Sequence, residues 1–245
     1  VSLAFALQVT IGFVALFTDW GIAALGAASN YVAVLLSYGR TGMEFMFGGL
    51  VGSSDSLGFI FAFSVLPIII FFSSLIAVLY HARIMQWMIR IMGGGLRAIL
   101  HTSHTESLSA AANVFVGQAE APLVARPYIP GMTRSELFAV MVGGMASIAG
   151  SVMAGYVALG VPLEYLLAAS FMAAPGGLLM AKLIEPETDT PAEPQQGEQL
   201  NGEKYINLID AAATGAMNGL QMAAAIGALL LAFVALIAMV NGMLE

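Results

Sequence analysis

Five long stretches of this chain contain no charged residue, and they limit what the chain can fold into more than any other feature. They cover residues 1–18, 56–80, 137–162, 165–181 and 211–244. Each is at or near the roughly 17 to 25 apolar residues that carry a helix across a bilayer. One such run could be a core helix of a large protein. Because a charge at the bilayer centre costs at least ~2.5 kcal/mol, however, five charge-free runs of this length indicate helices that lie in a membrane. We predict an all-α polytopic membrane protein with about five transmembrane helices.

The composition excludes several other classes. Of the 245 residues, 59% are apolar and 9% are charged, whereas soluble domains carry about 25% charged residues. The net charge of −7 excludes a nucleic-acid partner, and the absence of cysteine excludes disulfides. If the run at 56–80 ends in the cytoplasm, Arg40 is the only basic residue left outside, as the positive-inside rule favours. We therefore expect a multi-pass protein of the plasma membrane, in a bacterium the inner membrane.

The segment 101–130 holds two apolar stretches that are each too short to cross a bilayer. They lie at 108–117 and 123–129, on either side of the polar break Gln-Ala-Glu-Ala-Pro. Ten helical residues reach about 15 Å, roughly half the hydrocarbon thickness. This pattern predicts a re-entrant helical hairpin with Glu120 at membrane depth, where a carboxylate is functional by default. The alternative is a cytoplasmic loop with Glu120 in water, but residues 109–116 are too apolar for a free loop.

The distribution of charged and apolar residues divides the chain into six regions. Residues 85–100 place Arg90 and Arg97 on one helical face, which is typical of an amphipathic helix at a membrane interface. Residues 185–203 contain six acidic residues and three prolines, the composition of a hydrated connector. The six regions are 1–55 (first span and outer loop, part of a scaffold), 56–100 (second span and interfacial helix), 101–130 (hairpin), 131–184 (two spans of a transport block), 185–204 (acidic cytoplasmic linker) and 205–245 (long terminal span, part of the scaffold).

The run 112–123, Ala-Asn-Val-Phe-Val-Gly-Gln-Ala-Glu-Ala-Pro-Leu, resembles the first re-entrant hairpin of the concentrative nucleoside transporters. Further stretches that resemble this family lie at 126–130, 135–137, 146–152, 175–177 and 186–188. The resemblance implies a sodium-coupled importer of nucleosides, usually a homotrimer. It implies Na⁺ as the transported coupling ion and no organic cofactor. In the family the substrate lies between two hairpins and two broken helices.

The resemblance also implies site residues. Gln118 and Glu120 stand where the hairpin tip of the family contacts the nucleobase, and an amide and a carboxylate suit its polar edge. Val152 stands where an apolar wall lines the base. Ala119 replaces the Thr or Ser that the family usually has, so a hydroxyl contact worth about 1 kcal/mol is lost there.

The sodium ligands that the family implies are oxygens, which a hard cation prefers. They match the side chains of Asn113 and Ser147 and the carbonyls of Val116, Ser147 and Ile148. Small residues recur every four positions in the same span, at Gly143, Ser147, Ser151 and Gly155. Such a stripe lets another backbone approach closely. We expect the Ser147 hydroxyl to face the hairpin that carries Asn113.

Three other interpretations are weighed against a transporter. His101, His104 and Glu106 have a spacing that could bind a metal, but a solvated loop or helix start explains them better. A membrane-embedded enzyme would need a histidine within a span or a second carboxylate beside Glu120, and neither occurs, so we expect no enzyme. A non-transporting membrane scaffold or a truncated fragment of the carrier is the remaining alternative, because the family continues well beyond residue 245 with a second hairpin.

Overall fold

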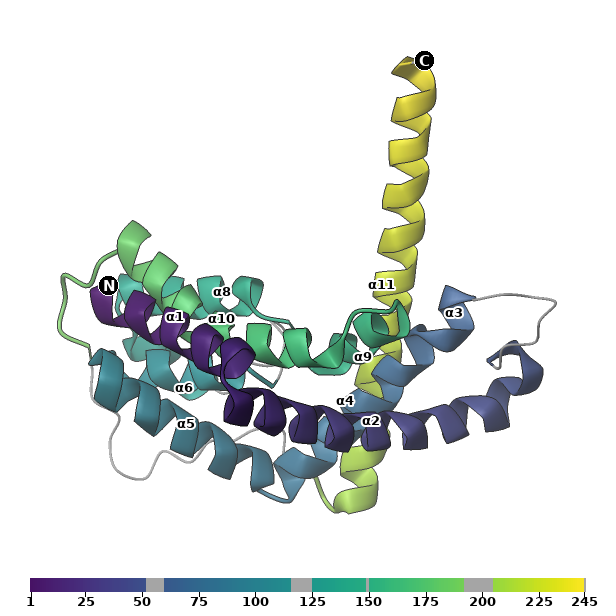
Figure 1. The fold of residues 1–245 in the computed structure, drawn as a ribbon, viewed down its shortest axis with the longest axis horizontal. Coiled ribbons are helices and arrows are strands. Elements are labelled where there is room, and N and C mark those ends of the chain that lie inside the picture. The colour runs from purple at the N-terminus through teal and green to yellow at the C-terminus, as the bar shows by residue number, and fades with distance from the viewer. Residues whose placement is uncertain (52–59, 116–124, 149, 192–204, 245) are drawn as a thin grey trace.

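The computed structural model describes residues 1–51, 60–115, 125–148, 150–191 and 205–244. Every regular element in these ranges is a helix, which confirms the all-α prediction. Most helices pack beside one another in a single body, and the last helix, α11, projects from it (Figure 1).

Four helices in the described ranges are long and apolar enough to cross a membrane. Three of them coincide with predicted spans, and the fourth does not. The helix α1 (Ser2–Phe17) fills the first charge-free run but has only 16 residues. The five predicted spans are therefore not matched helix for helix. The four long helices are Asp19–Leu50, Phe61–His81, Leu163–Ile184 and Leu208–Leu244.

The expected outer loop after the first span is instead the helix α2 (Asp19–Phe47), followed by the short 3-10 helix η1 (Gly48–Leu50). Thr18 starts α2, since its Oγ1 accepts a hydrogen bond from the Gly21 N–H at 3.2 Å. Asp19 lies in the first turn, where a negative charge is favourable, and Arg40 pairs with Glu44 one turn later at 3.0 Å. The helix accommodates these charges itself, so a search for charge-free runs missed it.

The predicted span at 137–162 is divided into two helices, α8 (Arg134–Ala146) and α9 (Gly150–Ala158). Ser147 ends α8 with φ −105° and ψ 158°, an extended conformation that no helix continues through. The sequence remains apolar across this point. Hydropathy therefore gave no sign of where the backbone leaves the helix.

The second span consists of α3 (Phe61–Ser64) and α4 (Leu66–His81), and Pro67 lies in the first turn of α4, where proline is tolerated. The next helix, α5 (Ile84–Leu100), agrees with the predicted amphipathic helix to within one residue. It packs on the protein through Met85, Ile89, Gly93 and Leu96, while Trp87 is exposed. One face of α5 is thus covered by protein and another is open.

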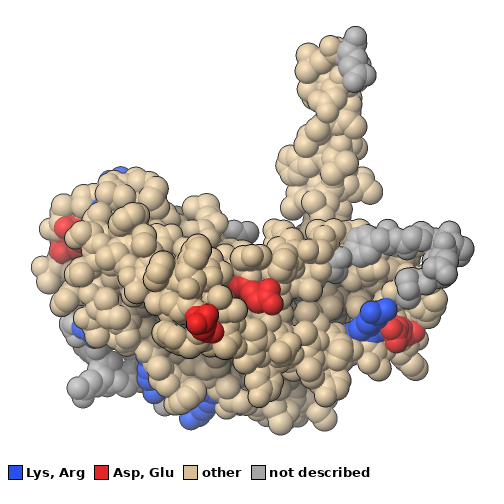
Figure 2. Space-filling model, in the orientation of Figure 1, with Lys and Arg blue, Asp and Glu red and all other residues tan. Residues whose placement is uncertain are grey.

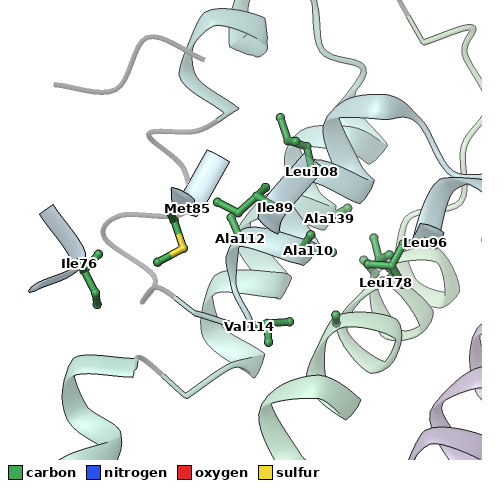
Figure 3. Packing of buried hydrophobic residues seen from close by; sticks show 13 residues of the cluster. Ile76, Met85, Ile89, Leu96, Leu108, Ala110, Ala112, Val114, Ala139 and Leu178 are labelled. Atoms are coloured by element: carbon green, nitrogen blue, oxygen red, sulfur yellow. The ribbon is translucent and has the colours of Figure 1, made fainter. Parts of the chain in front are cut away.

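The main core lies where α5 meets three further helices: α6 (His104–Ala112), α8 and α10 (Leu163–Ile184). Figure 3 shows side chains from these helices gathered at one point, with small alanines allowing close approach. The short 3-10 helix η2 (Arg126–Gly131) leads into α8. The labelled core residues include Ile89, Leu96, Leu108, Ala110, Ala112, Val114, Ala139 and Leu178.

Two terminal helices pack on different partners. On α1, a Cβ added at Gly12 would lie 2.8 Å from Cε of Met172, so α1 lies directly against α10. On α11 (Leu208–Leu244), a Cβ added at Gly219 would lie 2.8 Å from the Cα of Ile70, so α11 crosses α4 at backbone contact. Figure 2 shows the projecting part of α11 without a charged residue. Its large apolar side chains beyond Gly227 are exposed.

Candidate functional site

The helix α6 begins with a capping box. The Ser103 hydroxyl accepts from the Glu106 N–H at 3.2 Å, and Glu106 Oε2 accepts from the Ser103 N–H at 3.1 Å. All residues of α6 from Thr105 onward are buried, and most are alanine or serine, whose small side chains let neighbouring helices approach closely. The helix-start interpretation of Glu106 is confirmed. Its carboxylate is buried, however, and not solvated.

Asn113 ends α6 as an almost completely buried amide. Its backbone N–H donates to the Ser109 carbonyl at 3.0 Å, while its side chain is 2% exposed. Neither Oδ1 nor Nδ2 has a hydrogen-bond partner within the described ranges. A buried amide without partners costs about 1 to 3 kcal/mol. Such a group needs a partner that the described residues do not supply.

The amide of Asn113 lies against Gly143 of α8. A Cβ added at Gly143 would lie 2.8 Å from Asn113 Nδ2, which is closer than two such atoms approach. Glycine at this position therefore makes the room that the amide occupies. The small-residue stripe predicted for this span does meet the hairpin segment, and the contact described is made by Gly143.

The end of α6 also contacts the break between α8 and α9. The Gly150 N–H donates to the Phe115 carbonyl at 3.2 Å, and a Cβ at Gly150 would lie 2.4 Å from that oxygen. Only glycine fits there. Ser147 and Ile148 lie between these two contacts along the chain, and the Ser147 hydroxyl reaches the Gly144 carbonyl at 3.5 Å. The structure thus brings the end of α6 and the unwound segment of the next span together.

The remaining predicted site residues are less fully described. Val152 lies in the first turn of α9 and is half-buried. The hairpin tip with Val116, Gln118, Ala119 and Glu120 lies outside the described residues, as does the acidic linker from 192 to 204. The two ends of the segment predicted to form the hairpin lie close together, since the ring centroids of His104 and Tyr128 are 6.2 Å apart.

No cluster of metal-binding side chains occurs in the part of the chain that the structure describes, so His101, His104 and Glu106 form no metal site there. Glu106 instead forms a salt bridge with Lys182 at 2.5 Å. Sequence reasoning counted Lys182 only as an orienting charge and missed this pair. The capping motifs Ser-x-x-Glu at 103–106 and Thr-x-x-Glu at 133–136 were the available signal that both helix starts are built alike.

Glu187 belongs to the same charged group. Partial burial opposes its ionisation, but hydrogen bonds from Thr133 Oγ1 and the Asp189 N–H and the charge of Lys182 outweigh this and lower the pKa of Glu187. The beginning of the predicted acidic linker is therefore held in place by polar contacts.

A broken helix, a buried polar group beside the break and several long apolar helices are typical of a membrane transporter. Three family models match: "Na+ dependent nucleoside transporter N-terminus" over residues 1–50, "Nucleoside recognition" over 62–163 and "Na+ dependent nucleoside transporter C-terminus" over 165–245. The chain belongs to the concentrative nucleoside transporter family, as its sequence motifs predicted, and this family consists of transporters and not enzymes.

Relatives and solved structures match along almost the whole chain. A nucleoside permease of Helicobacter pylori is 49% identical over 97% of this chain, and the human sodium/nucleoside cotransporter 1 is 40% identical over all of it. CNTnw in an inward-facing substrate-bound state is 56% identical with a TM-score of 0.93 over 99% of this chain. The chain spans 57% of the Helicobacter protein, 37% of the human protein and 58% of CNTnw.

Proposed function

We propose that the full-length protein imports nucleosides together with sodium by alternating access, in the inner membrane of a bacterium. Membership of a family of multi-pass nucleoside transporters supports this proposal. The observation that carries it is the buried side chain of Asn113, which has no hydrogen-bond partner among the described residues and lies beside a break in the following span. A cation bound there would satisfy the amide oxygen.

In the proposed sodium site, Asn113 and Ser147 supply side-chain oxygens, and Val116, Ser147 and Ile148 supply carbonyls. The extended backbone at Ser147 supports this assignment, because a residue outside a helix has a carbonyl that no helical N–H occupies. Sodium is a hard cation that takes neutral oxygen ligands. Its binding would hold the end of α6 against the α8–α9 break.

In the proposed substrate site, Gln118 and Glu120 bind the polar edge of the nucleobase, Ala119 makes at most an apolar contact, and Val152 forms part of the apolar wall. Sodium next to the same hairpin would order its tip before the nucleoside binds. This order explains coupling, because the empty carrier would lack a formed nucleobase site.

We propose that a transport block moves against a scaffold formed by α4 and α11, and that three copies associate. We propose that α1 moves with the block, although residues 1–18 were expected to belong to the scaffold, because α1 lies directly against α10. The close crossing of α4 and α11 at Gly215 and Gly219 supports their assignment to one rigid unit.

Uptake of labelled uridine into proteoliposomes that contain the full-length protein tests the proposal. Uptake should require an inward sodium gradient, should collapse in Glu120→Gln and should need about tenfold more sodium in Asn113→Ala. Ser109→Ala is the matched control, because Ser109 is a buried residue one turn earlier on α6 whose hydroxyl likewise lacks a described partner. Uptake that ignores sodium, or normal uptake in Glu120→Gln, would contradict the proposal.

Orientation is tested separately on the naturally cysteine-free background. A cysteine in place of the exposed Arg90 should react with a membrane-impermeant maleimide only from the cytoplasmic side, and one in place of Arg40 only from outside. The opposite pattern would invert the proposed topology.

A further inference from the structure

Lys182, near the end of α10, holds three polar groups from three different places in the chain. Its Nζ lies 2.5 Å from Glu106 Oε1, 2.8 Å from Ser135 Oγ and 3.4 Å from Glu187 Oε2. The ammonium group donates hydrogen bonds to Ser135 and Glu187, and its contact with Glu106 is an ion pair. The side chain of Lys182 is 18% exposed and that of Glu106 is 1% exposed, so water screens this pair weakly.

Each partner of Lys182 is itself fixed to a helix start or to the segment after α10. Glu106 closes the capping box of α6 with Ser103. Ser135, in the first turn of α8, donates its hydroxyl to the Glu185 carbonyl at 2.7 Å. Glu187 accepts from Thr133 Oγ1 at 2.8 Å, and Thr133 is the residue that caps α8.

The same three helices meet again two turns away, at the proposed sodium site. Asn113 follows Glu106 by seven residues on α6, which is about 10.5 Å along a helix. There Asn113 faces Gly143 of α8. A Cβ added at Gly177 of α10 would lie 3.4 Å from the Gly143 Cα, so α10 also packs against α8 at this glycine.

We propose that Lys182 is a positioning residue for cation binding: by tying the start of α6 to α8 and α10, it sets the place of Asn113 and the Phe115 carbonyl relative to the α8–α9 break. This inference rests on the proposed function. Glu106 is the link, because a short helix held at its first turn can neither slide nor rotate without moving its last residue. Lys182 itself would touch neither sodium nor substrate.

Removal of the lysine charge should disturb this arrangement in a defined way. Glu106 without Lys182 is a buried carboxylate without a counter-charge, which is strongly destabilising. It must then take up a proton or turn toward water, and either change releases α6 from α10. The helix core around Leu108 and Ala139 would remain, so the loss should fall on the alignment of Asn113 more than on the fold.

The test measures the sodium concentration for half-maximal effect in the full-length protein, both on uridine uptake and on the melting temperature in detergent. Lys182→Met should raise this concentration about tenfold in both measurements, with the KM for uridine at saturating sodium within about twofold of wild type. Lys182→Arg keeps the charge but replaces three diverging donors by a planar fork, so it should give an intermediate value.

Two further variants guard against misfolding and non-specific charge effects. Glu106→Gln combined with Lys182→Met buries no charge and keeps a side chain that can cap α6, so it should fold and still need several-fold more sodium. Arg134→Met is the matched control, because it removes a cation at the same end of the body whose side chain is 85% exposed and pairs with Glu185. It should leave the sodium requirement unchanged.

The possible results separate the two proposals. A wild-type protein without sodium dependence in uptake or in melting would overturn the proposed function. A normal wild type, together with an unchanged sodium requirement in the double variant, would overturn the role of Lys182 and leave it a residue of stability alone.

Discussion

The helices α6 and α11 show opposite relations between composition and burial. Nearly every residue of α6 is buried, although the helix is rich in serine, threonine and alanine and carries Glu106. Most of α11 is exposed, although beyond Gly219 it is almost wholly apolar. In water this arrangement would be inverted. The comparison is typical of a membrane protein, because an apolar helix such as α11 suits hydrocarbon, while α6 is shielded by other helices because its polar groups have no place in lipid.

The largest effect is expected from adding a single methyl group at the buried contact between the end of α6 and the α8–α9 break. Gly150→Ala places a Cβ 2.4 Å from the Phe115 carbonyl, and a backbone atom cannot move aside as a flexible side chain would. We expect a cost of up to about 3 kcal/mol in stability and the loss of sodium-dependent uridine uptake. Gly94→Ala is the control, because nothing lies within 4 Å of a Cβ there. Equal uptake in both variants would contradict the contact.

A charged substitution on α11 tests whether its exposed apolar part lies in the bilayer. Leu231→Lys places an ammonium on a side chain that is 75% exposed within an apolar helix. It should cost about 2.5 to 3.5 kcal/mol if this part of α11 lies at the bilayer centre. The measurement is the inserted fraction in a membrane-insertion assay. Asn241→Lys, near the helix end, should insert almost normally. Equal insertion of the two variants would contradict the placement of residue 231 at the bilayer centre.

A smaller effect is expected at Glu187, the partly exposed carboxylate of the charged group around Lys182. The lowered pKa of Glu187 means that its contribution to stability is fully present above the ordinary value of 4.5 and is lost as the pH falls through the folded-state value. Glu187→Gln should therefore destabilise the protein by about 1 kcal/mol at neutral pH, and the difference from wild type should vanish in strong acid. Melting curves at both pH values check this, with Asp189→Asn as the control.

The smallest effect is expected at the exposed pair of α2. Arg40 and Glu44 are more than half exposed, so Arg40→Ala should change the free energy of unfolding by no more than about 0.5 kcal/mol. A larger loss in melting curves would mean that this end of α2 is covered in the assembled protein.

The sequence predicted the parts of the fold that lipid dictates. Charge-free runs located α4, α10 and α11, because hydrocarbon excludes charges along a whole helix, and the spacing of Arg90 and Arg97 located α5. The same rule missed α2, since its charges lie at a helix start and in a pair. The break at Ser147 was not predicted either, because hydropathy does not report backbone torsion angles.

The candidate site was predictable to a different degree. The position of Asn113 and its neighbours came from motif resemblance, and the contacts of Asn113 with Gly143 and of Phe115 with Gly150 needed coordinates. Lys182 could not be found from sequence, because Glu106 lies far away along the chain and salt bridges between distant positions leave no local pattern.

One residue, Thr18, separates α1 from α2, and this has a mechanical consequence. The helix α1 lies on α10, whereas α2 also reaches α4, where a Cβ at Gly39 would lie 2.9 Å from the Phe71 ring. If the block moves relative to the scaffold, rotation about φ and ψ of Thr18 would let α1 move with the block while α2 keeps its contact with α4. Restricting these rotations would then slow the movement of the block while leaving both ligand sites intact.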